Sequence, residues 1–220
     1  MAAERPALAG SELYDVATPE IEVESSEIVF TGRVWDVRRD TFAYGDGTLK
    51  REYTDHTGAV AVLALDDAER MLLIQQYRHP IAARDWEIPA GLMDVAGESP
   101  LAGAQRELAE EADLVATEWA VLSDFVMTPG GSTEAMRIYL ARGLSDADEV
   151  FARTGEEADI RRAWVPLDEV VTAVLERRVQ NPAVVVGALT AQAARSRGWS
   201  TLAPADALWE RREWVRGTRS

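Results

Sequence analysis

The chain has 220 residues, no cysteine, and a formal net charge of −15 at pH 7. The lack of cysteine excludes disulfide scaffolds, thiolate zinc sites and cysteine nucleophiles. The negative charge disfavours nucleic acid and anionic membranes as partners, because such a chain repels polyanions at long range.

The composition predicts one folded domain, or one domain with a small appended subdomain. Hydrophobic residues make up 47% of the chain, which is enough for a sizeable core. No stretch approaches the ~20 apolar residues of a membrane-spanning helix, and residues 1–10 lack the basic and apolar regions of a signal peptide. These features favour a cytoplasmic location.

The first part of the chain predicts a small sheet. Residues 1–18 are small, polar and aperiodic, so we expect a flexible N-terminus. Within residues 19–56, the segments 34–42 and 49–56 flank the turn-rich Tyr44-Gly45-Asp46-Gly47. This pattern predicts a hairpin in an N-terminal sheet subdomain.

Residues 57–200 read as the main domain. Residues 58–66 are almost continuously apolar, as in a strand that is buried on both faces. Further strands are expected at 71–77, 86–89, 121–127 and 135–141, and helices at 168–178 and 182–195. The mixture predicts an α+β fold with a mixed sheet between helices. Residues 201–220 form a C-terminal tail to which the sequence assigns no role.

The segment from Gly91 to Leu114 carries the strongest chemical signal. Ser99 and Pro100 mark a helix start. At ~100° per residue, Glu107, Glu110 and Glu111 then cluster beside an apolar stripe. Three adjacent carboxylates repel one another, and Mg²⁺ or Mn²⁺ would offset that repulsion, since both prefer oxygen ligands. The alternative is a solvated acidic helix face, which the three glutamates alone would favour.

The surrounding residues change that preference. Gly91, Glu98 and Arg106-Glu107-Leu108-Ala109-Glu110-Glu111 resemble the Nudix box, with the usual seven residues between Glu98 and Arg106. Two departures are visible. The loop from Gly91 to Glu98 is one residue longer than the family pattern, and Asp113 replaces a glycine at a helix end that prefers a left-handed conformation. Neither departure removes a ligand.

The resemblance implies a Nudix-type α/β/α sandwich that binds Mg²⁺ or Mn²⁺ at a pyrophosphate. It implies that the Ala90 carbonyl, Glu107 and Glu111 hold metal, with Glu110 assisting. Arg106 and Glu110 would take part in catalysis, Arg106 by orienting a carboxylate.

Further segments resemble the ADP-ribose pyrophosphatases within the family. They are Gln76-Tyr77-Arg78, Trp86 to Gly91, and Thr128 to Glu134, in which Pro129 lies fifteen positions after Leu114. The resemblance covers residues 20–198 and implies hydrolysis of ADP-ribose to AMP and ribose 5-phosphate.

Roles for the substrate-binding residues follow from the same resemblance. Arg78 would contact the diphosphate and Glu134 the terminal ribose, with Glu87 and Pro129 in the same set. Trp35 and Arg51 would sandwich adenine across a homodimer that exchanges its N-terminal subdomains. Taken alone, a tryptophan is more typical of a core and an arginine of a surface.

The general base is expected in the acidic loop 154–159. In the resembling enzymes a glutamate of this loop activates the attacking water, and such a loop can close over substrate. Either Glu156 or Glu157 could serve, and Glu157 is preferred.

Alternative functions differ in substrate or in class. Other nucleoside diphosphate sugars and dinucleoside polyphosphates are alternative substrates. A non-catalytic ADP-ribose sensor is disfavoured, because the carboxylate set is intact and no basic recognition helix stands out. A scaffolding protein with a solvated acidic helix is a third class. His56 and His79 lack a third partner for zinc, and His79, next to Pro80, is expected in a turn.

Overall fold

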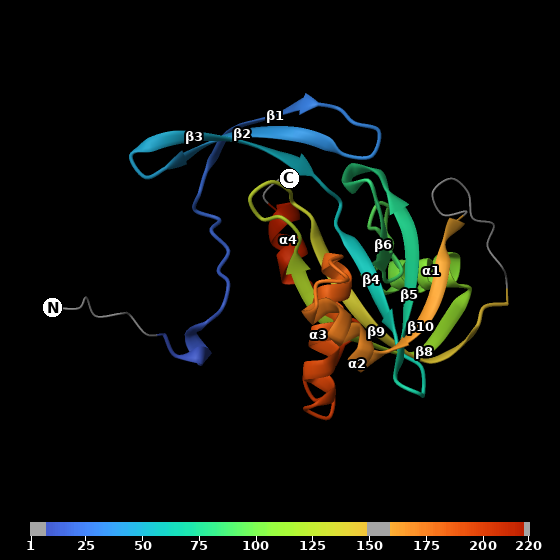
Figure 1. The fold of residues 1–220 in the computed structure, drawn as a ribbon. Coiled ribbons are helices and arrows are strands. Elements are labelled where there is room, and N and C mark those ends of the chain that lie inside the picture. The colour runs from blue at the N-terminus through green and yellow to red at the C-terminus, as the bar shows by residue number, and fades with distance from the viewer. Residues whose placement is uncertain (1–7, 149–158, 218–220) are drawn as a thin grey trace.

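The computed structural model describes residues 8–148 and 159–217, with only the backbone of residues 216 and 217. In Figure 1 a small sheet lies across the top of a larger body of sheets and helices. A short 3-10 helix, η1 (Gly10–Glu12), precedes the small sheet.

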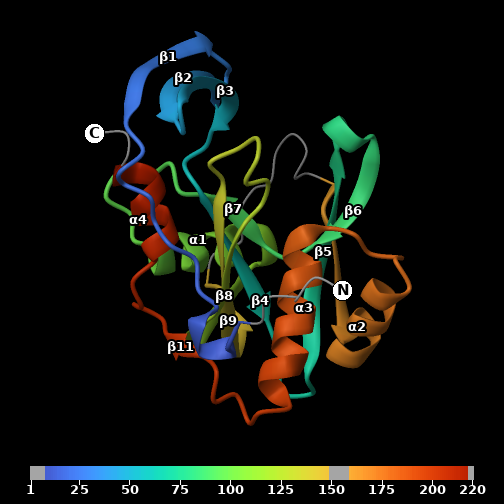
Figure 2. The same ribbon diagram turned by 90° about the vertical axis from the view of Figure 1, so that its left-hand side faces the viewer.

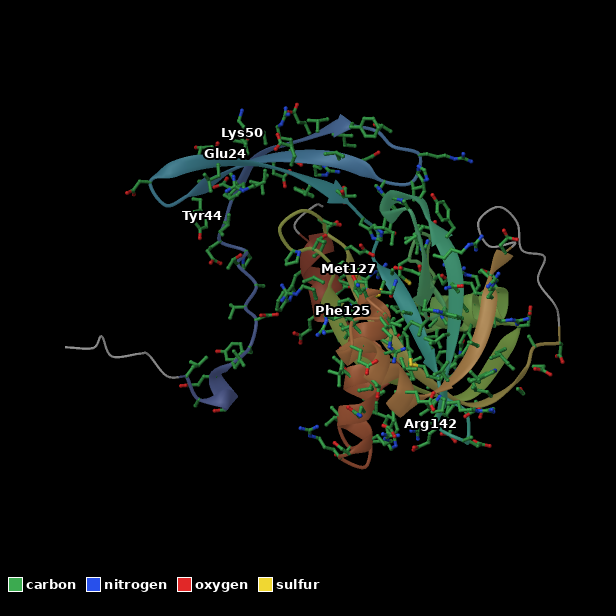
Figure 3. All side chains as sticks on the ribbon, viewed as in Figure 1. Glu24, Tyr44, Lys50, Phe125, Met127 and Arg142 are labelled. Carbon is green, nitrogen blue, oxygen red and sulfur yellow. The ribbon has the colours of Figure 1, made fainter. Side chains whose placement is uncertain are left out.

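The small sheet contains β1 (Val23–Phe30), β2 (Asp36–Tyr44) and β3 (Gly47–Asp55), all antiparallel and in that order. Gly45 has a φ of 60°, a conformation that glycine adopts without strain, and lies in the tight turn between β2 and β3. The predicted hairpin is therefore confirmed. Glu24, Tyr44 and Lys50, labelled in Figure 3, all lie on this sheet and apart from the helices.

The body has two sheets, with strand orders β11-β8-β9-β4-β7 and β10-β5-β6. Its elements are β4 (Ala59–Ala64), β5 (Arg70–Arg78), η2 (His79–Ile81), β6 (Ala83–Glu87), β7 (Ala90–Leu92), α1 (Pro100–Ala112), β8 (Leu114–Val126), β9 (Ala135–Asp146), β10 (Arg161–Pro166), α2 (Leu167–Leu175), α3 (Pro182–Arg195), β11 (Ala203–Pro204) and α4 (Glu210–Gly217). Strand β4 pairs parallel to β9 and antiparallel to β7, so the larger sheet is mixed. His79 lies in the turn η2, as predicted.

Strand β4 shows how the layers form. Its alternate residues Ala61 and Leu63 pack on the side of α2 and α3, while Val60 and Val62 pack on the side of α1. All six residues of β4 are buried, as the apolar run predicts for a strand covered on both faces. Figure 2 shows the same layering, with α3 and α1 on opposite sides of the sheet. The predicted α/β/α arrangement with a mixed sheet and an added antiparallel sheet is confirmed.

Two segments differ from the sequence expectation. Strand β8 begins at Leu114, whereas the sequence predicted its start at residue 121. The first half of the strand contains only exposed and half-buried residues, so it lacks the apolar run on which that prediction depended. The C-terminal segment, to which the sequence assigned no role, packs against the body where the structure describes it. Trp209 is 4% exposed, and Arg137 donates to the carbonyls of Ala207 and Leu208.

Among the described residues, no helix combines the length and the apolar character needed to cross a lipid bilayer.

Candidate active site

Helix α1 begins and ends as its sequence predicts. The Ser99 Oγ accepts a hydrogen bond from the Ala102 N–H at 3.2 Å, and Pro100 occupies the first turn. At the other end Asp113 adopts the left-handed conformation, with φ 57° and ψ 37°. Arg162 of β10 donates to the Ala112 carbonyl and, at 2.8 Å, to the Asp113 carboxylate. Arg162 therefore stabilises the negative, C-terminal end of the helix. It does so beside Asp113, the residue that stands where the family pattern has glycine.

Arg106 pairs with three carboxylates, one in the loop before helix α1 and two on the helix itself. Its guanidinium forms a two-pronged pair with Glu98, at 2.9 and 3.0 Å, and its Nη1 also donates to Glu107 and Glu110. The hydrogen bonds to Glu98 are the largest cause that raises the pKa of Arg106, and the same contacts lower the pKa of Glu98. Arg106 thus ties the loop before α1 to two carboxylates on the helix.

Glu107 and Glu111 are the buried carboxylates of the site, 9% and 6% exposed. Glu111 Oε2 accepts a hydrogen bond from the Ala90 N–H of β7 at 2.9 Å. Glu107 packs against Gly91, where an added Cβ would lie 1.8 Å from Glu107 Oε1. Only glycine at this position lets the strand approach the helix so closely.

These side chains open onto one hollow of about 550 Å³. It is lined by Gln76, Arg78, Ala90, Gly91, Leu92, Asp94, Arg106, Glu107, Glu110 and Glu111. The structure therefore brings Ala90, Arg78, Arg106 and the three glutamates together. Gln76 and Asp94 are lining residues to which the sequence assigned no role. Gln76 lies in a strand pattern that predicts only burial, and Asp94 lies in a loop.

The residues around the hollow fit a hard divalent cation in chemistry, although their side chains are held by protein partners. Within residues 8–148 and 159–217, no three acidic or histidine side chains already converge as a metal-binding group. Glu107 and Glu110 accept from Arg106, and Glu111 accepts from Ala90. The two buried carboxylates of Glu107 and Glu111, close to the backbone of Ala90 and Gly91, still supply the oxygen atoms that Mg²⁺ and Mn²⁺ prefer as ligands.

Arg78 reaches the hollow from β5 and is held by Glu87. Two hydrogen bonds of 2.7 Å join its guanidinium to the Glu87 carboxylate, which also accepts from Gln76 at 3.3 Å. Glu87 is itself buried and is not among the residues that line the hollow. The sequence grouped Glu87 with the substrate-binding residues, whereas the structure places it behind Arg78.

A second hollow, of about 680 Å³, is lined by residues of the small sheet and by the loop at residues 129–133. Arg51 and Pro129 both line it, together with Val215 of α4. Trp35 lines a different hollow with His56 and Met93. Within one chain, Trp35 and Arg51 therefore do not face the same space.

Glu134 lies beside His56, whose Nε2 is 3.9 Å from Glu134 Oε1. From the sequence, His56 was interpreted only as a candidate zinc ligand. Its contact with Glu134 was not predicted, because the two residues are far apart in the chain. Glu156 and Glu157, the two candidates for the general base, lie outside the described residues. Asp159, from the same loop, lies 3.7 Å from Arg84.

Comparison with known proteins defines the class of the chain. Residues 55–186 match the NUDIX domain. The chain is 40% identical over 195 residues to an ADP-ribose pyrophosphatase of Mycobacterium tuberculosis (strain ATCC 25618 / H37Rv), covering 88% of this chain and 93% of that protein. The chain belongs to the NUDIX family and is a Nudix hydrolase.

Other relatives are more distant. An ADP-ribose pyrophosphatase of Bacillus subtilis (strain 168) is 33% identical, over 70% of this chain and 83% of that protein. A methanol dehydrogenase activator of Bacillus methanolicus is also 33% identical, over 73% and 86%. The crystal structure of an ADP compounds hydrolase aligns with a TM-score of 0.67 at 23% identity, covering 82% of this chain and 96% of that one, and shows the shared fold.

Proposed function

We propose that this Nudix hydrolase cleaves the pyrophosphate bond of ADP-ribose with Mg²⁺ or Mn²⁺, giving AMP and ribose 5-phosphate. The observation that carries the proposal is the hollow in which Glu107, Glu110 and Glu111 face Arg78. The names of the relatives from Mycobacterium tuberculosis and Bacillus subtilis support ADP-ribose as the substrate.

The carboxylates would hold the cation. Glu107, Glu111 and the Ala90 carbonyl are the proposed ligands, with Glu110 assisting. A bound divalent ion neutralises phosphoryl oxygens and lowers the pKa of water. Arg106 keeps Glu98, Glu107 and Glu110 close together, so that the repulsion among them is balanced while the site forms.

Arg78 would bind the diphosphate, because its charged group opens onto the hollow while Glu87 fixes its direction. A planar guanidinium always carries its charge and matches the oxygens of a phosphate in geometry. The attacking water would lose its proton to Glu157, or to Glu156, of the acidic segment 154–159. Water adds to one phosphorus, and the oxygen that bridges the two phosphorus atoms leaves with the other.

Adenine would bind between Trp35 of one protomer and Arg51 of another, in a homodimer that exchanges the β1–β3 sheets. All eight residues of β1 are exposed, among them Ile28 at 50% and Phe30 at 62%. Such apolar exposure on a sheet that lies apart from the body favours burial against a second copy (Figure 1). Pro129 lines the hollow next to Arg51 and would form its wall. The cytoplasmic location stays a prediction of the sequence.

The test is product analysis of wild type, Glu107→Gln and the control Glu118→Gln. Each protein receives ADP-ribose, GDP-mannose or a dinucleoside polyphosphate in ¹⁸O water, with Mg²⁺, Mn²⁺ or EDTA. Glu118 is an exposed glutamate of β8, so its variant matches the chemical change away from the hollow.

We expect AMP and ribose 5-phosphate from wild type and Glu118→Gln, with ADP-ribose as the best substrate. Glu107→Gln should lose at least ~100-fold in kcat, since it removes a charged ligand of the metal. Release of AMP at the wild-type rate by Glu107→Gln would overturn the metal assignment. A preference for GDP-mannose would overturn the assignment of ADP-ribose as the substrate.

A further inference from the structure

We infer that His56 is a positioning residue that holds the Glu134 carboxylate and the Trp35 ring, and that it thereby sets selectivity for the terminal sugar of the substrate. This inference rests on the proposed function, in which Glu134 contacts the terminal ribose and Trp35 the adenine. His56 itself would touch neither part of the substrate.

The backbone around His56 is fixed to the loop that carries Glu134. The His56 N–H donates to Thr133 Oγ1 at 2.8 Å, and the Thr133 N–H donates to the Thr54 carbonyl at 3.1 Å. A third bond, of 2.9 Å, runs from the Thr54 N–H to the Gly131 carbonyl. Three hydrogen bonds therefore join the end of β3 to this loop, although 77 positions separate His56 from Thr133 in the chain.

One hydrogen bond to the imidazole selects between its two neutral forms. The Gly58 N–H donates to His56 Nδ1 at 3.0 Å, so Nδ1 is the unprotonated nitrogen. The ring proton is then on Nε2, the nitrogen that faces Glu134. This bond needs the backbone conformation of Gly58, whose φ of +86° favours glycine.

Nε2 lies 3.9 Å from Glu134 Oε1, which is longer than a hydrogen bond. At this distance the N–H dipole attracts the carboxylate electrostatically, from a His56 side chain that is 6% exposed to a Glu134 side chain that is 22% exposed. Burial lowers the pKa of His56, and the charge of Glu134 only partly opposes this effect. The ring therefore stays neutral near pH 7 and acts as a directed donor.

The other contact of the ring is with Trp35. The two ring centroids are 5.2 Å apart, with planes tilted by 36°. Trp35 is 46% exposed, so it keeps a large accessible surface for a base while His56 supports it. One buried imidazole thus contacts residues proposed to bind opposite ends of the substrate, and its loss should loosen both.

The experiment compares two polar replacements of similar size. In His56→Asn the amide oxygen can still accept from Gly58, but no donor reaches Glu134. In His56→Gln the longer amide can place an N–H near the position of Nε2. Kinetics with ADP-ribose and ADP-glucose are measured for both variants, for Glu134→Ala, and for His56→Asn combined with Glu134→Ala.

We expect His56→Asn to raise KM for ADP-ribose about 10-fold with kcat within about 2-fold, because it removes the donor that is directed at Glu134 while the reacting groups stay in place. Its preference for ADP-ribose over ADP-glucose should fall by a similar factor. His56→Gln should recover most of both. In the Glu134→Ala background, His56→Asn should change the preference by less than about 2-fold, because His56 acts through Glu134.

An independent measurement uses ¹⁵N NMR of the histidine side chains in the wild-type protein, which reports the protonated nitrogen without any substrate. We expect protonation on Nε2 of His56. Protonation on Nδ1 would overturn the inference, as would unchanged sugar preference in His56→Asn. Wild type without ADP-ribose hydrolysis would instead overturn the proposed function, and the NMR result would still test the contacts of His56.

Discussion

The variant Gly91→Ala should lower the catalytic rate of this protein and leave its fold intact. The added Cβ would lie 1.8 Å from Glu107 Oε1 and 2.0 Å from Glu107 Cδ, whereas ordinary contacts begin near 3.4 Å. The carboxylate must therefore move by about 1.5 Å to restore a normal contact. It lies at the end of a flexible side chain, so the fold can absorb the change, but a proposed metal ligand is displaced.

A misplacement of ~1 Å in a catalytic group lowers the rate about 100-fold. We expect that loss in kcat at saturating Mg²⁺, with a shift in Tm of no more than a few degrees. Gly47→Ala is the matched control, because nothing lies within 4 Å of its added Cβ and it is in the small sheet. The reasoning is refuted if Gly91→Ala keeps wild-type kcat, or if it unfolds the protein and so affects packing and not the site.

Three further predictions concern stability. Arg137→Ala should destabilise the protein by about 3 kcal/mol, because this buried arginine pairs with Asp124 and binds two carbonyls of the C-terminal segment. Urea unfolding measures the loss in free energy of unfolding, and a loss below about 1 kcal/mol would contradict the prediction. Arg162→Ala should cost only about 1 kcal/mol, since the arginine is partly exposed, and thermal unfolding at two salt concentrations would show it. Because the pKa of His56 is lowered in the folded protein, the unfolded chain binds a proton on this imidazole more readily. The free energy of unfolding should therefore be highest above pH 6.5 and decrease as the pH falls below 6.5. His56→Asn should lack this part of the pH dependence in urea unfolding.

The fold was predictable where the pattern of side chains is strong. The apolar run of β4 predicts burial on two faces, and Ser99 with Pro100 predicts the start of α1. The first half of β8 was missed because it is half exposed, and its pairing with β9 is what keeps it extended. The C-terminal segment was missed because its stability comes from distant partners, Arg137 above all.

The site was predictable to the extent that it lies in one continuous motif. The spacing of Glu107, Glu110 and Glu111 fixes them on one side of a helix, and the structure places all three at one hollow. The role of Glu87 depends on pairing between β5 and β6, which brings it to Arg78. His56 and Glu134 meet only through the hydrogen bonds between β3 and a distant loop. Local sequence does not encode such contacts.

The charges that line the active-site hollow explain why an acidic protein would need a cation to bind an anion. Asp94, Glu107, Glu110 and Glu111 supply four carboxylates, against the two guanidinium groups of Arg78 and Arg106. Both arginines are already paired with carboxylates, Arg78 with Glu87 and Arg106 with Glu98. The surroundings therefore repel a diphosphate until divalent charge is added.

Calorimetry can measure this dependence without turnover, with a non-hydrolysable ADP-ribose analogue. In EDTA we expect binding at least ~100-fold weaker than in Mg²⁺, which corresponds to about 2.7 kcal/mol. Glu110→Gln removes one negative charge from a partly exposed position and should narrow that difference by strengthening the binding in EDTA. Equal affinity in EDTA and in Mg²⁺ would mean that Arg78 and Arg106 alone bind the diphosphate, and the proposed role of the cation in binding would be wrong.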